Sequence, residues 1–206
     1  MSATSHRPGE GARPAAQSRP QGPAGVFVDL AGVLLDGMPS HGQLPGLRGG
    51  VGAALRLLDR LDYRIIALAP CSLDRRQASR LLPGRLADLL ARERVALAGC
   101  CFCGGASTPC LACPPAPAML LSAAREHGLA LSASWLLARD HYHLAAGQRA
   151  GCRTLAISAD DSHDTPPLPP ASTPQWTGID GPAAYTVRDI VDAALTIIRL
   201  DGESTL

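Results

Sequence analysis

The segment that decides the fold spans residues 25–36 and reads GVFVDLAGVLLD. Residues 26–28 form a short β-branched and aromatic run that ends at Asp29, and Gly32 follows three residues later. An apolar strand that ends in a carboxylate and then turns on glycine places that carboxylate at the C-terminal edge of a sheet. The chemistry of α/β proteins is concentrated at that edge. The plainer interpretation of this segment alone is a buried strand whose Asp caps the turn.

Further along the chain, strand-like apolar segments alternate with segments of helical periodicity. We expect strands at 63–69, 95–97, 134–138 and 153–158, and helices at 46–61, 74–90 (broken near Pro83), 119–127, 144–150 and 186–200. This alternation predicts an α/β fold, a three-layer, doubly wound, Rossmann-like parallel sheet without a large cap domain. We expect the domain to span 25–200, between a disordered tail at 1–24 and a C-terminal tail at 201–206.

The composition excludes several functional classes. The 206 residues carry a formal net charge of +1 and only 3% aromatic side chains, which argues against a nucleic-acid partner. No apolar run is long enough to span a membrane, and no apolar segment near the N-terminus indicates a secretory signal. The sequence therefore predicts a cytoplasmic protein without nucleic-acid or membrane partners. The chain contains no lysine, so all 19 basic residues are arginines.

Three further motifs indicate a family resemblance. They read PAPAMLL at 115–121, GLALSASW at 128–135 and AGQRAGC at 146–152. Together with the segment around Asp29 and a Cys-rich loop just before Pro115, they resemble the haloacid dehalogenase-like (HAD) phosphatases over roughly 25–200. The most similar branch contains D,D-heptose 1,7-bisphosphate phosphatase and histidinol phosphatase.

The resemblance assigns catalytic positions, and several carry unsuitable residues. The first motif, Asp-x-Asp-Gly in the family, places the nucleophile at Asp29 and the general acid/base at Ala31, which cannot transfer a proton. The phosphate-binding Thr or Ser after the second strand corresponds to Ala69, followed by Pro70. Ser72 lies close by as a candidate substrate-binding residue, although its register argues against the role.

The remaining family positions are also altered. The phosphate-neutralising lysine corresponds to Pro114. The two Mg²⁺-holding aspartates of the family correspond to Arg139 and His143. Asp140 is one residue out of register, so we expect its side chain to turn to the other side. Because Mg²⁺ prefers carboxylate oxygen, these replacements make Mg²⁺ binding doubtful.

These losses favour a non-catalytic pseudoenzyme of the phosphatase family, acting as a binding, assembly or regulatory protein. Its partner would be another protein or an active paralogue. The alternative is an active HAD hydrolase that cleaves a sugar (heptose) phosphate or similar phosphomonoester through Asp29. In that case Arg139 supplies positive charge and contacts the substrate, while His143 supplies the proton.

Five of the seven cysteines lie within residues 100–113. We expect Cys101 and Cys103, with Cys110 and Cys113, to form two knuckles that close a structural Zn²⁺ site within a loop at 98–118. The related branch carries a zinc site in the same loop. Cys100 is an alternative ligand, and free or redox-active thiols are the alternative state.

Other Cys and His residues carry less information. Cys71 and Cys152 are expected in the core. The Pro-Cys-x-x-Cys fragment at 109–113 matches half of a zinc-deaminase signature, but no His-x-Glu or Cys-x-Glu precedes it. A zinc-dependent or thiol-based activity at the loop is the third hypothesis. We interpret His141 and His143 as solvated loop residues.

Overall fold

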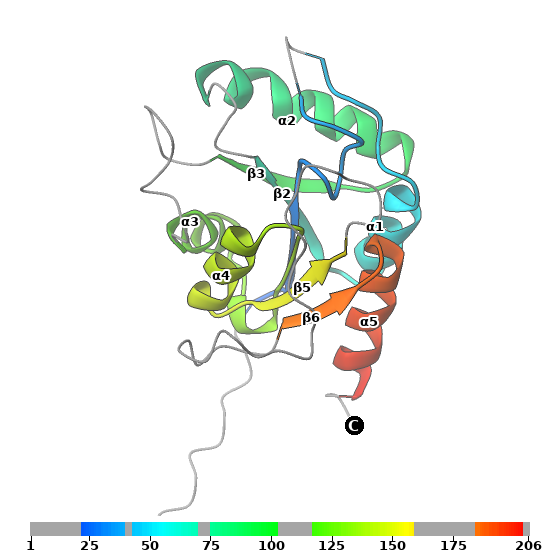
Figure 1. The fold of residues 1–206 in the computed structure, drawn as a ribbon. Helices are drawn as coiled ribbons and strands as arrows, with labels where there is room; N and C mark the ends of the chain where they lie inside the picture. Colours follow the sequence, from blue (N-terminus) through cyan, green and yellow to red (C-terminus); the bar gives the residue numbers. More distant parts are fainter. Residues whose placement is uncertain (1–21, 40–42, 70–74, 103–116, 159–183, 204–206) are drawn as a thin grey trace, which may run out of the picture.

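The strand expected from the first segment lies near the middle of the sheet. The computed structural model (Figure 1) describes residues 22–39, 43–69, 75–102, 117–158 and 184–203. Strand β1, Gly25–Asp29, is buried along its whole length. Its valine and phenylalanine side chains suit a pleated, covered surface. It pairs on one side with β2, Arg64–Ala69, and on the other with β4, Trp135–Ala138.

All the strands of the described sheet run parallel, in the order β3-β2-β1-β4-β5-β6. The outer strands are β3 at Leu97–Phe102, β5 at Arg153–Ile157 and β6 at Ala184–Val187. The order reverses direction between β1 and β4. In open parallel sheets, ligands bind outside the carboxyl ends of the strands at such a switch point.

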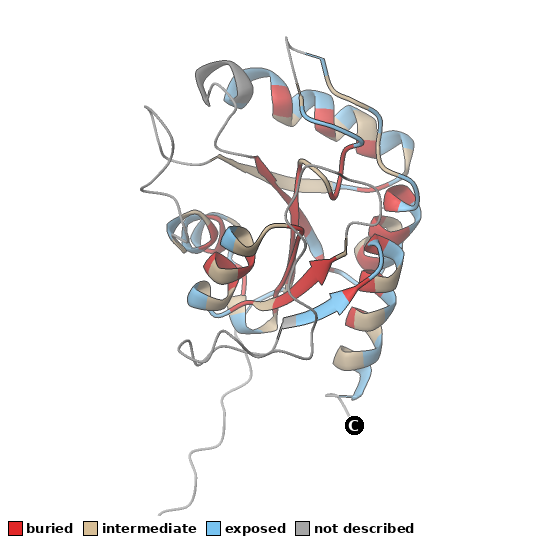
Figure 2. Cartoon of the chain, viewed as in Figure 1, coloured by how far each residue is buried: buried red, intermediate tan, exposed pale blue. Residues whose placement is uncertain are grey.

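Helices cover both faces of the sheet (Figure 1). One face carries α1 at Val51–Asp59, α2 at Arg75–Arg92 and α5 at Ile190–Glu203. The other carries α3 at Ala118–His127 and α4 at His141–Ala150. Figure 2 shows the buried residues concentrated in the sheet and on the helix sides that face it. The α/β three-layer fold predicted from the sequence is thus confirmed.

Side-chain alternation assigns each position of β1 to one face. Val26 and Val28 pack in the core under α1, α2 and α5, whereas Phe27 packs in the core under α3 and α4. A strand buried on both faces reads as a continuous apolar run rather than an alternating one. The same alternation directs Asp29, two residues after Phe27, toward the α3 and α4 side.

Helix α1 begins at Val51, five residues after the expected start, and two further elements of the first half differ from the sequence expectation. β3 continues through Phe102 and so includes residues placed in the Cys-rich loop. Helix α2 continues through Pro83 instead of breaking there. Pro83 removes one backbone donor, but Leu82, Leu86 and Leu90 are buried along the same helix. Burial of this stripe outweighs the local cost of the proline.

The second half contains an additional strand and longer helices. β6 was not expected, because its last two residues were assigned to the terminal helix, which begins at Ile190 instead. Helix α4 begins at His141, three residues before the expected start. Helix α5 continues to Glu203, so residues 201–203 are helical and do not belong to a tail. None of the helices in the described part of the chain is long and apolar enough to cross a membrane.

A polar cluster lies at the N-terminal edge of the sheet, and we call it the Asp201 cluster. The carboxylate of Asp201, in the last turn of α5, accepts hydrogen bonds from the Tyr63 hydroxyl and from Trp135 Nε1, the latter at 3.2 Å. It also forms an ion pair with Arg153, whose guanidinium carbon lies 4.0 Å from the centre of the Trp135 ring system. This cluster ties α5 to the starts of β2, β4 and β5.

Candidate functional site

The carboxylate of Asp29 is buried at the C-terminal end of β1. Only 4% of the residue is exposed, and its Oδ1 has no hydrogen-bond partner among the described residues. Burial raises the pKa of Asp29 from 3.8 to about 7, an effect that the nearby His143 partly offsets. A buried carboxyl group whose pKa lies near neutrality is characteristic of a functional site.

The start of helix α4 brings two further groups to this edge. Asp140 is the N-cap residue, and its Oδ1 accepts a hydrogen bond from the backbone N–H of His143 at 2.8 Å. Aspartate suits this position because its side chain satisfies an otherwise unpaired amide of the first turn. The cap fixes the Asp140 carboxylate and places the His143 imidazole in the same turn.

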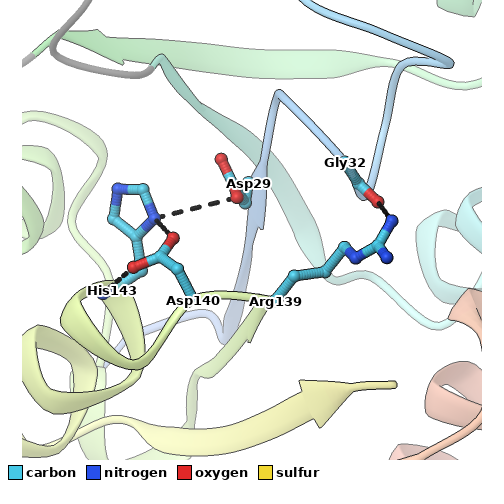
Figure 3. Close-up of polar contacts among 5 residues, drawn as sticks. All are labelled: Asp29, Gly32, Arg139, Asp140 and His143. Carbon is cyan, nitrogen blue, oxygen red and sulfur yellow. Dashed lines mark hydrogen bonds and ion pairs between the residues drawn. The ribbon is translucent and has the colours of Figure 1, made fainter. Parts of the chain in front are cut away.

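The side chains of Asp29, Asp140 and His143 converge (Figure 3), and we call them the switch-point triad. Nδ1 of His143 lies 3.7 Å from Oδ2 of Asp29 and hydrogen-bonds to Oδ2 of Asp140. One potential ligand atom from each residue lies within 4.8 Å of the other two. The triad therefore joins the end of β1 to the segment after β4, across the switch point of the sheet.

The charges within the triad depend on one another. Burial alone would lower the pKa of His143, but the hydrogen bond to Asp140 and the charges of Asp29 and Asp140 raise it. Burial alone would raise the pKa of Asp140, but the hydrogen bonds and charge of His143 lower it. An imidazolium bound to an ionised Asp140 beside a partly protonated Asp29 is the arrangement expected near neutral pH.

Arg139 points away from the triad, contrary to the role assigned to it from sequence. Its Nη1 donates to the carbonyl oxygen of Gly32 at 3.2 Å, on the other side of β1 in Figure 3. The sequence expectation had turned Asp140 away from the site, which was wrong. It had kept Arg139 in the site, whereas the Arg139 guanidinium hydrogen-bonds to Gly32 and reaches Asp29 only through a small effect of its charge on the pKa. The register explains why. Val28 pairs with Leu137, so Asp29 is level with Ala138 and shares a face with Asp140.

The other residues predicted for the site fall into two groups. Ala31 follows Asp29 in the turn, and Ala69 ends β2 as a buried methyl side chain. Neither can transfer a proton or bind phosphate through its side chain. Ser72 and the position assigned to the family lysine, Pro114, lie outside the described residues.

The cysteine loop is only partly within the described chain. Cys103, Cys110 and Cys113 lie outside it, so the zinc prediction stays a prediction. Cys100 packs against the core under α1, α2 and α5, whereas Cys101 packs against the opposite core. The two thiols thus face opposite sides of the sheet, and one site cannot use both without rearranging β3. Burial raises the pKa of Cys101 to about 11.

Sequence reasoning set Asp140 aside and gave His143 a role only in the alternative function, interpreting it otherwise as a solvated loop residue. The signal was present, because Asp-x-x-His after an apolar strand places an N-cap carboxylate and a third-position imidazole in one turn. His143 is a residue of helix α4 with a side chain that is 20% exposed, and so it is not a solvated loop histidine.

The donor atoms of the triad favour some cations over others. Two carboxylates and one imidazole nitrogen differ from the all-oxygen set that Mg²⁺ prefers. The buried Oδ1 of Asp29 has no hydrogen-bond partner among the described residues, so this atom can still accept a donor or bind a cation. The residues present therefore fit Mg²⁺ poorly and fit an ion that accepts imidazole better.

The strand order and the acidic switch-point site define a Rossmann-like α/β protein. No family model and no curated protein matches the sequence. Among solved structures, the fold is that of the HAD-superfamily phosphatases. D,D-heptose 1,7-bisphosphate phosphatase from B. bronchiseptica, solved with magnesium and phosphate, gives a TM-score of 0.64 at 16% identity. That match covers 86% of this chain and 99% of the other.

Two further structures show the same fold. D,D-heptose 1,7-bisphosphate phosphatase from Burkholderia thailandensis has a TM-score of 0.57 at 14% identity, covering 85% of this chain and 98% of its own. The cobalt-bound deoxy-D-mannose-octulosonate 8-phosphate phosphatase from Haemophilus influenzae has a TM-score of 0.53 at 14% identity. That match covers 87% of this chain and 90% of the other. The resemblance stated from the motifs is confirmed at the level of the fold.

Proposed function

We propose that this protein is a non-catalytic relative of the HAD phosphatases that keeps the switch-point edge as a binding site. Its role is that of a binding, assembly or regulatory protein, with a protein partner or an active paralogue. One observation carries this proposal. At the described positions that the resemblance assigns to proton transfer, phosphate binding and metal binding stand Ala31, Ala69 and Arg139, the last turned toward Gly32.

The state of Asp29 supports the same conclusion. A nucleophilic carboxylate has to be ionised, and because burial raises the pKa of Asp29 to about 7, only part of the protein carries that charge near neutral pH. In the family, a lysine and a metal ion stabilise the charge on phosphate and aspartate. This chain contains no lysine, and its Arg139 guanidinium hydrogen-bonds to a backbone carbonyl. Loss of the general acid/base alone lowers rates by about 10²–10⁴-fold.

A specific contact favours a second function, phosphomonoester hydrolysis through Asp29. Nδ1 of His143 lies 3.7 Å from Oδ2 of Asp29, so the imidazole is close enough to transfer a proton near the reacting carboxylate. In this reaction Asp29 would attack phosphorus, the alcohol would leave with a proton from His143, and water would hydrolyse the aspartyl phosphate. The substrate class would be a sugar phosphate, such as a heptose phosphate.

A phosphate-release assay separates the two functions. Purified protein is incubated with Mg²⁺ or Mn²⁺ and a panel of sugar phosphates and histidinol phosphate. Asp29→Asn serves as the test variant and Asp36→Asn, in an exposed segment after β1, as the matched control. We expect wild type and Asp29→Asn to release equal background phosphate. Release that Asp29→Asn abolishes and Asp36→Asn retains would establish the phosphatase instead.

A further inference from the structure

We infer that Asp29, Asp140 and His143 bind one first-row transition-metal ion of the Zn²⁺ or Co²⁺ type, in preference to Mg²⁺. The ligand set differs from that of the family's metal site, because an imidazole at His143 replaces one metal-holding aspartate, while Arg139 replaces the other and points away, so that Asp140 takes its place. The inference goes beyond the proposed function and does not depend on it. It rests on the arrangement of carboxylates and imidazole, whether or not the protein releases phosphate.

The distances between the donor atoms suit a single ion. Ligand atoms bound to one ion at about 2.0–2.2 Å lie roughly 3–4 Å from one another. The ligand atoms of the triad all lie within 4.8 Å, and the gap between His143 Nδ1 and Asp29 Oδ2 is 3.7 Å. The hydrogen bond between His143 and Asp140 would open to admit the ion.

The buried carboxylate of Asp29 is the second observation that points to a cation. The residue is 96% buried, with 4% of its surface exposed, and Oδ1 has no hydrogen-bond partner among the described residues. An ionised carboxylate in such a place is costly unless a charge or a hydrogen bond compensates it. The triad carries two carboxylates and one imidazole, so a divalent ion would neutralise the site where a single imidazolium cannot.

The two ligands from α4 are held in place before any ion binds. The Oδ1 atom of Asp140 accepts the His143 backbone N–H at 2.8 Å, which leaves Oδ2 directed at the site. The imidazole presents Nδ1 to both carboxylates in Figure 3, with its other nitrogen directed away from them. Fixed orientation of ligands by such outer hydrogen bonds typically contributes 10–100-fold to metal affinity.

The nature of the donors selects the class of ion. Imidazole nitrogen binds zinc, cobalt and iron well, whereas Mg²⁺ favours oxygen and retains much of its water. Three protein ligands leave the fourth position of a tetrahedral ion open. The side chains of His143 and Asp140 are 20% and 30% exposed, so this position can face solvent. The opening gives the ion a path from solvent and space for an exogenous ligand.

The competing explanation for the convergence of these side chains is that a proton shared between His143 and Asp140, and no metal ion, holds them together. His143 and Asp140 hydrogen-bond without any metal, and this pair could serve only to cap α4. Metal binding would replace the proton on Nδ1 and release it to the buffer. Proton release coupled to binding therefore distinguishes the two, as does the loss of binding when the imidazole is removed.

The test uses full-length protein titrated with Co²⁺ after chelator treatment. Cobalt reports its own ligands, because thiolate coordination gives an intense near-ultraviolet charge-transfer band and a nitrogen–oxygen site does not. The cysteine loop is thereby separated from the triad within the same sample. Variants that replace Cys101, Cys103, Cys110 and Cys113 with serine confirm the separation where they fold.

His143→Gln is the principal variant. Position 143 is the third of helix α4, where glutamine suits a capping arrangement with Asp140, so the helix is expected to form. His141→Gln, in the same turn, is the matched control, since His141 is not among the grouped ligand atoms. Circular dichroism and thermal unfolding verify that both variants fold.

We expect about one equivalent of Co²⁺ or Zn²⁺ that gives no thiolate band, in addition to any metal held by the cysteine loop, with proton release and a raised melting temperature. We expect His143→Gln to weaken this binding at least about tenfold and His141→Gln to leave it unchanged. Equal binding by His143→Gln, cobalt bound only with a thiolate band, or Mg²⁺ binding as tightly as Zn²⁺ would each overturn the inference. None of these outcomes bears on phosphate release, so the proposed function fails or stands separately.

Discussion

Each of the two edges of the sheet contains a carboxylate among polar groups, but these groups compensate the carboxylate to different extents. At the N-terminal edge, Asp201 receives hydrogen bonds from Tyr63 and Trp135 and forms an ion pair with Arg153. At the C-terminal edge, Asp29 is buried more deeply, and no arginine among the described residues pairs with its Oδ1 as Arg153 pairs with Oδ1 of Asp201. A backbone hydrogen bond from Ala31 and the charge of His143 offset its burial only in part.

The comparison shows that a carboxylate stabilises this fold at the N-terminal edge and destabilises it at the C-terminal edge. A carboxylate whose partners are in place holds helices and strands together. A buried carboxylate without enough partners opposes folding when it is ionised, and it persists where it serves a ligand or a reaction. The same substitution, aspartate to asparagine, should therefore act in opposite directions at the two edges.

Replacing Asp201 by asparagine should have the largest effect on stability. However the amide turns, its NH₂ group faces a donor from Tyr63, Trp135 or Arg153, and the ion pair to Arg153 is lost. The Asp201 side chain is 25% exposed, so solvent compensates part of the loss. We expect the free energy of unfolding to fall by about 2–4 kcal/mol in urea denaturation at neutral pH.

Asp192→Asn on the same helix is the matched control. Its partner Arg188 has a side chain that is 81% exposed, and such surface pairs contribute little. We expect no measurable change for the control. Equal losses for the two variants would mean that the Asp201 cluster holds α5 no better than a surface ion pair.

Asp29→Asn should stabilise the metal-free protein, with a dependence on pH. Burial raises the pKa of Asp29 from 3.8 to about 7, so the folded state holds the proton more tightly than the unfolded state. The wild type therefore loses stability as the pH rises from about 4 to about 7, where the folded protein gives up this proton. Asparagine stays neutral, so the variant should be more stable at pH 8 and nearly equal at pH 4.

The pKa change corresponds to an upper bound of about 4 kcal/mol, and local relaxation should leave about 2 kcal/mol. Urea denaturation at both pH values in the presence of EDTA measures the difference. Asp36→Asn, at an exposed position, should show no pH-dependent gain. A destabilised Asp29→Asn at pH 8 would show that the carboxylate is well partnered, and the contrast between the two edges would not hold.

Much of the fold was predictable because its signals are local. β1 and β4 are short apolar runs, and parallel strands buried on both faces leave such runs in the sequence. The glycines at 128 and 151 adopt the left-handed conformation that ends α3 and α4. β6 and the last turn of α5 were missed because tertiary pairing and the Asp201 cluster decide them, and neither leaves a periodic pattern.

The site was harder to predict because the family alignment competed with strand geometry. The motif match assigned Arg139 and His143 to the metal positions and set Asp140 aside. Alternation from Asp29 through the β1–β4 register instead places Asp140 on the face of Asp29. The N-cap then determines where His143 lies. The sequence contained both signals, but using them required the register of β1 against β4, which single-sequence patterns do not give.

Gly32→Ala should have the smallest of the three effects and tests what keeps Arg139 out of the triad. Gly32 has φ +91°, and an added Cβ would lie 3.0 Å from Cδ of Arg139. The left-handed backbone costs an alanine about 1–2 kcal/mol. The methyl group would also crowd the Arg139 side chain, whose guanidinium donates a hydrogen bond to the Gly32 carbonyl. We expect the free energy of unfolding to fall by about 1–2 kcal/mol.

Gly49→Ala is the control, because a Cβ at that exposed position meets nothing within 4 Å and the backbone there is not left-handed. Since Arg139 lies on the opposite side of β1 from the triad and has only the smallest of the effects on the pKa of Asp29, Gly32→Ala should lower stability with little change in Co²⁺ affinity. Arg139 already lowers the pKa of Asp29 slightly, so a large change in cobalt affinity would mean that its charge acts on the metal ligands more strongly than its contacts indicate. The groups on the two sides of β1 would then act as one site, in which an arginine compensates Asp29 as Arg153 compensates Asp201.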